Sequence, residues 1–401
     1  MPPCPSPSGP LLLDGRRPDS IRAAAEVLRS GGLVALPTET VYGLGADARN
    51  AEAVARVFRA KGRPSDNPLI VHLPDAAAVD AVARMTPLGR RLAARWWPGP
   101  LTLVLQARPG LPALTTAGLS TVAVRVPDHP VALELLLAAD VPVAAPSANR
   151  SGRPSPTTAA HVLADLGDAD LGDAVAVVLD GGPCRVGVES TVVDARGELP
   201  VVLREGAVTR EQLGARGGTG DASAASPGTR HRHYAPACEV LLRPRGRAAT
   251  EAAELAAAGR RVGLLASAGG AASPPVADLG RFGNVQHLAS MLYGALRDAD
   301  ARQLDVCVLE EVPEIGLGRA VMDRMRRAAA GSVRMPPASA AGRQVVSRSD
   351  QRSDADAPQQ WGMPRRPSHE GAGNGGGDAD TGRPVRTDDS APCAGMPRSL
   401  P

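Results

Sequence analysis

The sequence predicts an α/β fold, in which a domain built on a twisted, mixed, open sheet is followed by a smaller α/β domain of the parallel-sheet type. Short apolar segments typical of buried strands alternate with segments whose apolar residues recur at helical spacing. In the second domain every strand is followed by a helix, which favours parallel pairing. Aromatic residues make up 2% of the chain and hydrophobic residues 43%, so Ala, Val and Leu are expected to form the cores.

The first domain is predicted to span residues 16–215, after a flexible, Pro-rich lead at 1–15. The helix at 50–62 begins at Asn50, a good capping residue, and ends at Gly62, a typical C-terminal stop. Further helices are expected at 18–32, 130–139 and 157–166. Strands are expected at 33–37, 68–74, 101–107, 121–127, 141–146, 174–180, 190–194 and 200–206.

Residues 216–237 are rich in Gly, Ala and Ser and are interpreted as a linker or lid. The second domain follows at 238–331. Its strands are expected at 239–244, 261–267 and 305–312, and its helices at 250–259, 284–298 and 318–330. The tail at 332–401 has few large apolar residues and is predicted to be disordered.

Composition excludes several classes of protein. The five cysteines are scattered and form no CxxC or Cys/His cluster, so neither a disulfide framework nor a zinc site is predicted. The net charge of +3 is too small to indicate nucleic-acid binding by itself. We see no signal peptide and no apolar run long enough to cross a membrane, so we expect a cytoplasmic protein without a membrane partner.

Lys61 is the only lysine among 45 Lys and Arg residues. It ends the helix predicted at 50–62, and Arg63 follows two positions later. A cation there can simply complement the helix dipole, which contributes about 0.3–1 kcal/mol, and a single lysine can also survive by chance. Neither alternative explains the polar turn at 65–67 that follows. The pair is therefore interpreted as the basic side of an anion site.

Further polar residues lie at the ends of predicted strands, where function usually resides. Ser147 and Asn149 follow the strand at 141–146, and they supply neutral groups that can hold an anion without adding charge. An ordinary turn is the alternative. His72 lies inside a strand, where an interior histidine with satisfied hydrogen bonds is the commoner outcome. Glu189 precedes the strand at 190–194.

Standard motifs do not compete with this interpretation. "GLGADA" (43–48) satisfies GxGxxA, but the acidic residue expected about 20 positions later would fall in a basic turn, so we reject a dinucleotide site. The sequence contains no P-loop, GxSxG, HExxH or calcium loop. An anion pocket without a named loop remains.

Taken together, the motifs resemble the YrdC-type threonylcarbamoyl-AMP synthases. The family's KxR and SxN motifs correspond to Lys61-Gly62-Arg63 and Ser147-Ala148-Asn149. The remaining matches are "PTETVYGLG" (37–45), "NPLIVHL" (67–73), "RVP" (125–127), "ESTVVD" (189–194), "LREG" (203–206) and, in the linker, "SPGTRHRHYAP" (226–236). The second domain resembles that of the family's long form.

The resemblance implies a YrdC-like catalytic domain that makes L-threonylcarbamoyladenylate and pyrophosphate from L-threonine, hydrogencarbonate and ATP. The product serves N6-threonylcarbamoyladenosine formation in tRNA, so a tRNA threonylcarbamoyl transferase is the expected downstream partner. Mg²⁺ is expected to arrive with ATP, and no recognisable protein motif holds it. The basic turn also permits weak binding of double-stranded RNA or tRNA.

The resemblance also implies roles for individual residues. The residues expected to be catalytic are Lys61, Arg63, Ser147 and Asn149. Those expected to contact ATP are Arg63, Asn67, Thr121, Ser147, Ser155, Arg204 and Tyr234, with Tyr234 folding over the pocket as a lid. Those expected to surround threonine are Thr40, His72, Arg125, Ala145 and Ser190, with Arg125 gripping the carboxylate.

Two alternatives keep the same fold. One is a non-catalytic module that binds double-stranded RNA or tRNA, which requires a broad positive face that this nearly balanced chain does not indicate. The other is carbamoyl transfer in hydrogenase maturation, where related domains occur in larger proteins with cysteine clusters that are missing here.

Overall fold

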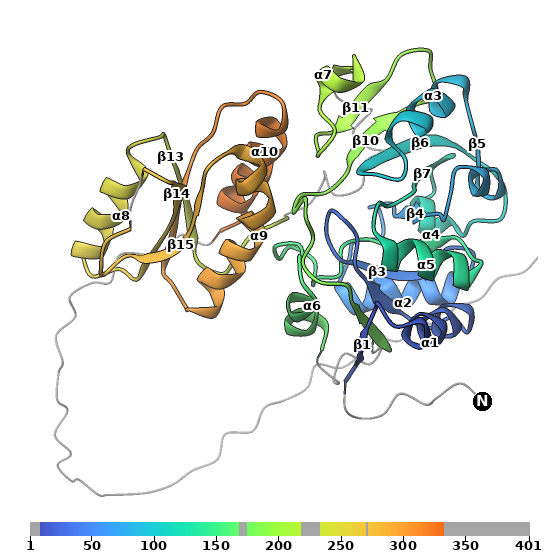
Figure 1. The fold of residues 1–401 in the computed structure, drawn as a ribbon, viewed down its shortest axis with the longest axis horizontal. Coiled ribbons are helices and arrows are strands. Elements are labelled where there is room, and N and C mark those ends of the chain that lie inside the picture. Colours follow the sequence, from blue (N-terminus) through green and yellow to red (C-terminus); the bar gives the residue numbers. More distant parts are fainter. Residues whose placement is uncertain (1–8, 168–174, 218–232, 270–271, 333–401) are drawn as a thin grey trace, which may run out of the picture. The chain divides into compact units, whose positions relative to one another are not determined.

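The computed structural model describes residues 9–167, 175–217, 233–269 and 272–332. In this part of the chain a mixed sheet of twelve strands forms the first domain (Figure 1), with the order β1-β9-β2-β3-β8-β4-β7-β6-β10-β11-β12 and β5 paired to β6. Its strands are β1 (Leu11–Asp14), β2 (Val34–Leu36), β3 (Gly43–Asp47), β4 (Ile70–His72), β5 (Ala83–Arg84), β6 (Leu101–Ala107), β7 (Thr121–Arg125), β8 (Val143–Ala144), β9 (Val177–Asp180), β10 (Thr191–Asp194), β11 (Val201–Arg204) and β12 (Arg216–Gly217).

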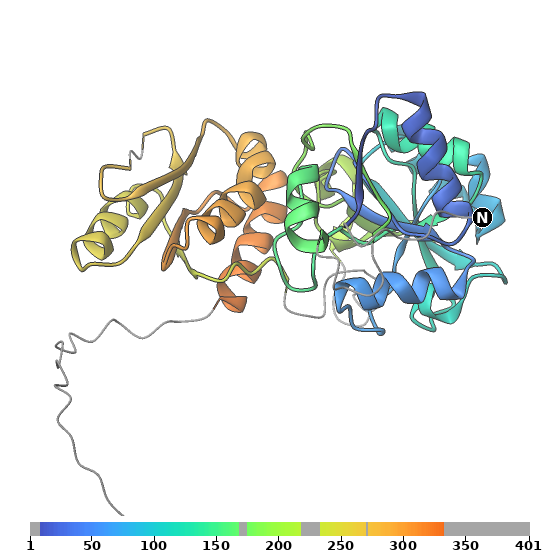
Figure 2. The same cartoon turned by 90° about the horizontal axis from the view of Figure 1, so that it is seen from below.

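Helices cover both faces of this sheet, and α1 and α2 lie on opposite faces (Figure 2). Alternate residues of β2 point to opposite sides, as the strand period of two requires. Val34 packs with α1 and α5, whereas Ala35 packs with α2 and α6. The helices are α1 (Pro18–Arg29), α2 (Ala51–Lys61), α3 (Pro87–Trp96), α4 (Ala113–Thr116), α5 (Pro130–Ala139), α6 (Ala159–Leu166), α7 (Arg210–Leu213) and the 3₁₀ helix η1 (Ala77–Ala81).

Helix α2 has the ends that its sequence predicts. The Asn50 side chain accepts hydrogen bonds from the backbone N–H groups of Glu52 and Ala53. Gly62 closes the helix with φ of 61°, in the left-handed region that glycine tolerates. These two ends fix where Lys61 and Arg63 leave the helix.

The second domain has four parallel strands in the order β13-β16-β14-β15, which confirms the predicted parallel sheet. Its helix α8 packs on one face, with Val306 and Val308, and α9 and α10 pack on the other, with Cys307 and Leu309. The elements are β13 (Glu239–Arg243), α8 (Ala248–Ala257), β14 (Val262–Ser267), β15 (Ala277–Phe282), α9 (Val285–Ala301), β16 (Val306–Glu310) and α10 (Leu317–Gly331).

The structure differs from the sequence prediction in several places. The expected lead at 1–15 contains a strand, because residues 11–14 pair in parallel with β9. The glycine-rich segment at 43–47 forms strand β3 between β2 and β8. A Cβ at Gly45 would lie 2.8 Å from Val143, so glycine allows these strands to approach. Most of the predicted linker and nearly all of the predicted tail, 218–232 and 333–401, lie outside the described residues. Within the described residues, no helix is long and apolar enough to span a membrane.

Candidate active site

A cavity opens in the first domain where the segments after β2, α2 and β8 meet the segment before β10. It is lined by Thr38, Thr40, Val41, Gly43, Arg63, Pro68, Leu69, Ile70, His72, Arg125, Ala145, Pro146, Ser147, Asn149, Arg153, Ser155, Glu189, Ser190, Arg204, His233 and Tyr234. The structure therefore brings together all the site residues expected from the sequence except Lys61, Asn67 and Thr121. They come from segments far apart in the chain.

Lys61 lies beside the cavity rather than in its lining. Its ammonium donates to the backbone carbonyls of Ser147, at 2.5 Å, and of Asn149. The Lys61 carbonyl in turn accepts a hydrogen bond of 2.8 Å from Ser151 N–H. The side chain is 4% exposed, and burial together with nearby Arg63 lowers its pKa well below the usual value. Lys61 thus pins the turn that carries the SxN residues.

Within that turn, the two polar side chains are held in fixed positions. Ser147 Oγ donates to Asn149 Oδ1 at 2.5 Å. The amide nitrogen of Asn149 donates to the carbonyls of Arg150 and Arg153, at 2.8 and 2.9 Å. A side chain with so many partners loses little further freedom when a ligand binds.

Arg63 is aimed by backbone carbonyls. Its Nε donates to Asn67 O at 3.2 Å and one terminal nitrogen donates to Pro68 O at 2.9 Å. Burial, followed by repulsion from Arg204, lowers the pKa of Arg63 to about 10, so the group stays charged at neutral pH. Asn67 therefore acts on Arg63 through its carbonyl, and its side chain does not line the cavity.

Basic side chains outnumber acidic ones in the described lining of the cavity. Arg63, Arg125, Arg153 and Arg204 line it, and Glu189 is the only acidic side chain among the described lining residues. Burial also lowers the pKa of Arg204. Cations that are partly stripped of water and close to one another attract an anionic ligand more strongly than exposed cations do.

One side of the cavity combines Arg125 with neutral groups. Arg125 donates to Thr40 Oγ1 at 3.0 Å and to Gly99 O at 3.2 Å. Its other terminal nitrogen lies 2.6 Å from Glu39 Oε2, an ion pair whose angles do not make a hydrogen bond. Nearby, His72 is 4% exposed and its Nδ1 has no hydrogen-bond partner. Burial, with a smaller effect of Arg125, lowers the pKa of His72 to about 3, so the ring is neutral.

Glu189 is the centre of a buried network. Its carboxylate accepts hydrogen bonds from Ser155 Oγ at 2.7 Å, from the Tyr293 hydroxyl at 2.9 and 3.1 Å, and from Arg324 Nε at 3.1 Å. Burial alone would raise the pKa of Glu189, but Arg324, Arg204 and Ser155 together lower it to about 2. The group is therefore a permanent anion.

Ala145 and Thr121 differ in their position relative to the cavity. Ala145 lines the cavity, and its N–H donates to Ile70 O at 2.9 Å. Thr121 begins β7, at the opposite end of the strand from Arg125, and lies outside the lining. At about 3.3 Å of rise per residue the two ends are separated by roughly 13 Å.

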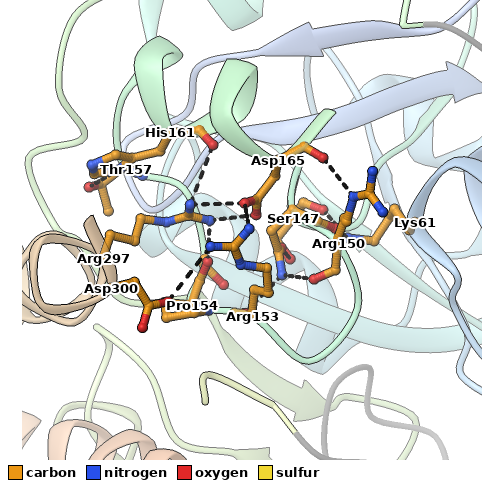
Figure 3. A network of polar contacts seen from close by, with 12 residues as sticks. Lys61, Ser147, Arg150, Arg153, Pro154, Thr157, His161, Asp165, Arg297 and Asp300 are labelled. Atoms are coloured by element: carbon orange, nitrogen blue, oxygen red, sulfur yellow. Dashed lines mark hydrogen bonds and ion pairs between the residues drawn. The ribbon is translucent and has the colours of Figure 1, made fainter. Parts of the chain in front are cut away.

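Sequence reasoning gave no role to three charged or aromatic residues of the lining, namely Arg153, Glu189 and His233. Figure 3 shows Arg153 with Asp165 and Asp300. Arg153 is 2.9 Å from Asp165 and 3.7 Å from Asp300. The available signal was their position: Glu189 and His233 lie inside the matched segments 189–194 and 226–236, and Arg153 lies four residues after Asn149.

Two family models match the chain in succession. One, described as "Telomere recombination", matches residues 26–206, and one described as "Threonylcarbamoyl-AMP synthase, C-terminal domain" matches residues 201–330. A threonylcarbamoyl-AMP synthase of Bacillus subtilis is 43% identical over 78% of this chain and 94% of its own length. The chain belongs to the threonylcarbamoyl-AMP synthase family. Another relative, the threonylcarbamoyl-AMP synthase of Pyrococcus abyssi, is 44% identical over 77% of this chain and 93% of its own length.

Solved structures of the threonylcarbamoyl-AMP synthase family agree with the fold. The crystal structure of P. abyssi Sua5 complexed with L-threonine is 41% identical and has a TM-score of 0.72. The match covers 81% of this chain and 99% of that one, so both domains are included. This likeness fits a mixed α/β domain followed by a domain with a parallel sheet.

Proposed function

We propose that this chain is an L-threonylcarbamoyladenylate synthase, which makes threonylcarbamoyl-AMP and pyrophosphate from L-threonine, hydrogencarbonate and ATP. The observation that carries the proposal is the cavity, in which four arginines face neutral hydroxyl, amide and imidazole groups. Such a site favours anionic ligands, which the reaction requires. The names of the relatives support the same activity.

Threonine would bind beside Arg125. The guanidinium can grip the carboxylate, since charge-assisted hydrogen bonds to a fixed fork are strong and directional. Thr40, Ser190 and the unpaired nitrogen of neutral His72 can meet the hydroxyl and amine, while Ala145 leaves room for the methyl group. The structural relative that holds L-threonine supports this ligand.

ATP would occupy the other side, towards Arg63, Ser147, Asn149, Ser155, Arg204 and Tyr234. Arg63 and Arg204 would neutralise phosphate oxygens, and Ser147 and Asn149 would contribute neutral polar groups by exchanging hydrogen bonds within the turn for bonds to the ligand. Lys61 would act through the turn that it pins, and Asn67 through Arg63. Thr121 would contact ATP only beyond the cavity lining.

The chemistry requires charge neutralisation and exclusion of water. The threonine amine attacks the carbon of CO₂ released from hydrogencarbonate and loses a proton, which gives a carbamate. A carbamate oxygen then attacks the α-phosphorus of ATP, and the bond to the bridging oxygen breaks, so pyrophosphate leaves with that electron pair. Arg63 and its neighbours stabilise charge that builds on the phosphorus oxygens. Buried side chains limit hydrolysis of the carbamate and of the mixed anhydride.

Mg²⁺ would enter with ATP. Among the described residues, no group of three or more His, Cys, Asp or Glu side chains could hold a metal ion. The one carboxylate of the lining, Glu189, is already bonded to Ser155, Tyr293 and Arg324. Phosphate oxygens, rather than a protein cage, would therefore hold the ion, which neutralises phosphate charge when bound.

The product is a reactive mixed anhydride, so a tRNA threonylcarbamoyl transferase must consume it promptly. We place both steps in the cytoplasm. The arginines of the cavity are assigned to ATP and threonine, and recognition of tRNA is assigned to the transferase.

Mass spectrometry tests the proposal. Protein incubated with ATP, L-threonine and ¹³C-labelled hydrogencarbonate should form a threonyl-containing adenylate that carries one ¹³C. The same product without label would show that its carbonyl does not come from hydrogencarbonate, and plain AMP as the sole product would exclude the activity.

A further inference from the structure

One face of helix α9, in the second domain, meets the wall of the cavity in the first domain. Tyr293, Arg297 and Asp300 are spaced by four and three residues, so they lie on the same side of the helix. Each contacts a segment that carries a cavity residue. The proposed function gives these residues no role, and they do not line the cavity themselves.

Tyr293 holds both Glu189 and the linker residue Tyr234. Its hydroxyl donates to both carboxylate oxygens of Glu189, and its ring stacks on that of Tyr234 with centroids 5.3 Å apart. Arg324 of α10 reinforces the arrangement, because its guanidinium bonds Glu189 and lies 5.8 Å from the Tyr234 ring centroid. Tyr293 and Arg324 are both 0% exposed. Tyr234 thus rests on side chains of the second domain.

Arg297 and Asp300 act on a neighbouring part of the wall (Figure 3). Arg297 makes a two-pronged ion pair with Asp165, at 3.2 and 2.8 Å, and bonds the carbonyl of Pro154. Asp165 and Asp300 are the two acidic partners of Arg153. The segment from Arg153 to Ser155 is therefore anchored to α9.

Gly187 lets α9 come this close. A Cβ on Gly187 would lie 2.3 Å from the carbonyl oxygen of Ala289 and 2.4 Å from the Cα of Ser290, both backbone atoms of α9. Ala289 precedes Tyr293 by one helical turn, on the same side of the helix. The glycine is two residues before Glu189, so the helix backbone and the Tyr293 hydroxyl meet the same short loop.

We propose that α9 is a positioning element for the nucleotide: Tyr293, with Arg324, holds Glu189 and Tyr234, and Arg297 with Asp300 holds Arg153, so that the second domain sets the affinity for ATP. The inference rests on the proposed function. It predicts that ATP is affected more than threonine, since Arg297 and Asp300 hold the segment that carries Ser155, and among the described residues no polar contact of α9 is made with Thr40, His72 or Arg125.

The first experiment removes one oxygen atom from the full-length protein. Tyr293→Phe keeps the ring on Tyr234 but loses the two hydrogen bonds to Glu189. Tyr42→Phe is the matched control, because its buried hydroxyl also bonds two partners, Asp180 and Gly182, which lie outside the lining. Tyr293→Phe should raise the KM for ATP about five- to tenfold and change the KM for threonine less than twofold. Tyr42→Phe should leave both values within about twofold.

A double-mutant cycle with Glu189→Leu, which removes both acceptor oxygens, decides whether the effect passes through Glu189. We expect Tyr293→Phe to add less than twofold in the Glu189→Leu background. Fully additive effects, a Tyr293→Phe value equal to that of Tyr42→Phe, or equal rises in both KM values would overturn the inference. A wild-type protein that releases no pyrophosphate would instead refute the proposed function, so the two failures are distinguishable.

The second experiment tests the close approach of α9. Gly187 and Gly182 both have left-handed backbone angles, with φ of 79° and 84°, but a Cβ on Gly182 would meet nothing within 4 Å. Gly187→Ala should raise the KM for ATP at least fivefold more than Gly182→Ala does. Because both glycines have φ in the left-handed region, equal effects would show that displacement of α9 is irrelevant to the nucleotide and would overturn the inference.

Discussion

The Lys61 ammonium and the Ser147 carbonyl oxygen lie 2.5 Å apart, although 86 residues separate them in the chain. With the second bond to Asn149 O, this contact joins the end of α2 to the turn after β8. The two family motifs, KxR and SxN, are therefore parts of one local structure. The lysine fixes the geometry of the turn, and Arg63 faces the cavity.

Replacement of Lys61 tests this link. Lys61→Met should lower kcat/KM on the order of 10²-fold, because the turn that carries Ser147 and Asn149 loses the ammonium that holds it in place. Lys61→Arg should not restore the rate, since a wide guanidinium cannot reproduce a compact ammonium between two carbonyls. Pyrophosphate release gives the rates. Arg59→Met, which changes an exposed cation on the same helix, is the control and should keep more than half the activity. A near-normal rate for Lys61→Met would remove the lysine from the mechanism.

Arg125→Lys should weaken threonine binding selectively. Lysine lacks the planar guanidinium fork of arginine, so one of the charge-assisted hydrogen bonds to the threonine carboxylate is lost. The KM for threonine should therefore rise roughly 10- to 100-fold. The KM for ATP should change less than about threefold. Arg196→Lys changes an exposed ion pair with Asp194 and serves as the control. A rise in the KM for ATP of the same size would place Arg125 on the nucleotide instead.

The protein should lose stability in acid, because His72 is buried in its neutral form. The pKa of His72 is about 3 in the folded protein and 6.5 without burial, so between these values the unfolded chain binds a proton that the folded chain does not. The free energy of unfolding should therefore fall as pH drops below 6.5, by up to about 1.4 kcal/mol per pH unit for this residue. Above pH 6.5 this loss of unfolding free energy should be absent, because His72 is then neutral in both states.

Urea unfolding at pH 7 and pH 5 checks this prediction. The difference between the two pH values should be smaller for His72→Gln than for the wild type, because glutamine does not titrate. His161 and His233, whose pKa values burial lowers to about 4 and about 3, should keep part of the acid sensitivity in that variant. An unchanged difference would mean that His72 is protonated in the folded protein.

Gly62 should contribute to stability through its backbone conformation alone. Its φ of 61° is unfavourable for any residue with a Cβ, so Gly62→Ala should lower the free energy of unfolding by about 1 kcal/mol. Gly197→Ala is the control, since a Cβ there would also meet nothing within 4 Å but the backbone is not left-handed. Equal stability of the two variants in urea would contradict the explanation.

Sequence reasoning found elements whose signals are local. Helix α2 was predicted because Asn50 and Gly62 mark its two ends within the segment itself. Strand β3 was not predicted, because Gly43 and Gly45 indicate a turn on their own. The extended conformation there depends on pairing with β2, which is near in sequence, and with β8, which is distant in sequence. Strand order depends on such partners, which no local pattern contains.

Local sequence patterns are limited in the same way for the residues of the cavity. The family motifs identified most of the cavity lining, including Arg63, Ser147 and Arg204. They could not show that Lys61 bonds two backbone carbonyls, because a carbonyl partner leaves no mark on the sequence. Nor could they show that Glu189 is held by Tyr293 and Arg324, since these partners come from another domain.

Release of pyrophosphate with each substrate left out in turn tests the central claim most directly. We expect release only when ATP, L-threonine and hydrogencarbonate are all present, because the carbamate is the attacking anion. Release at the full rate without threonine would contradict it.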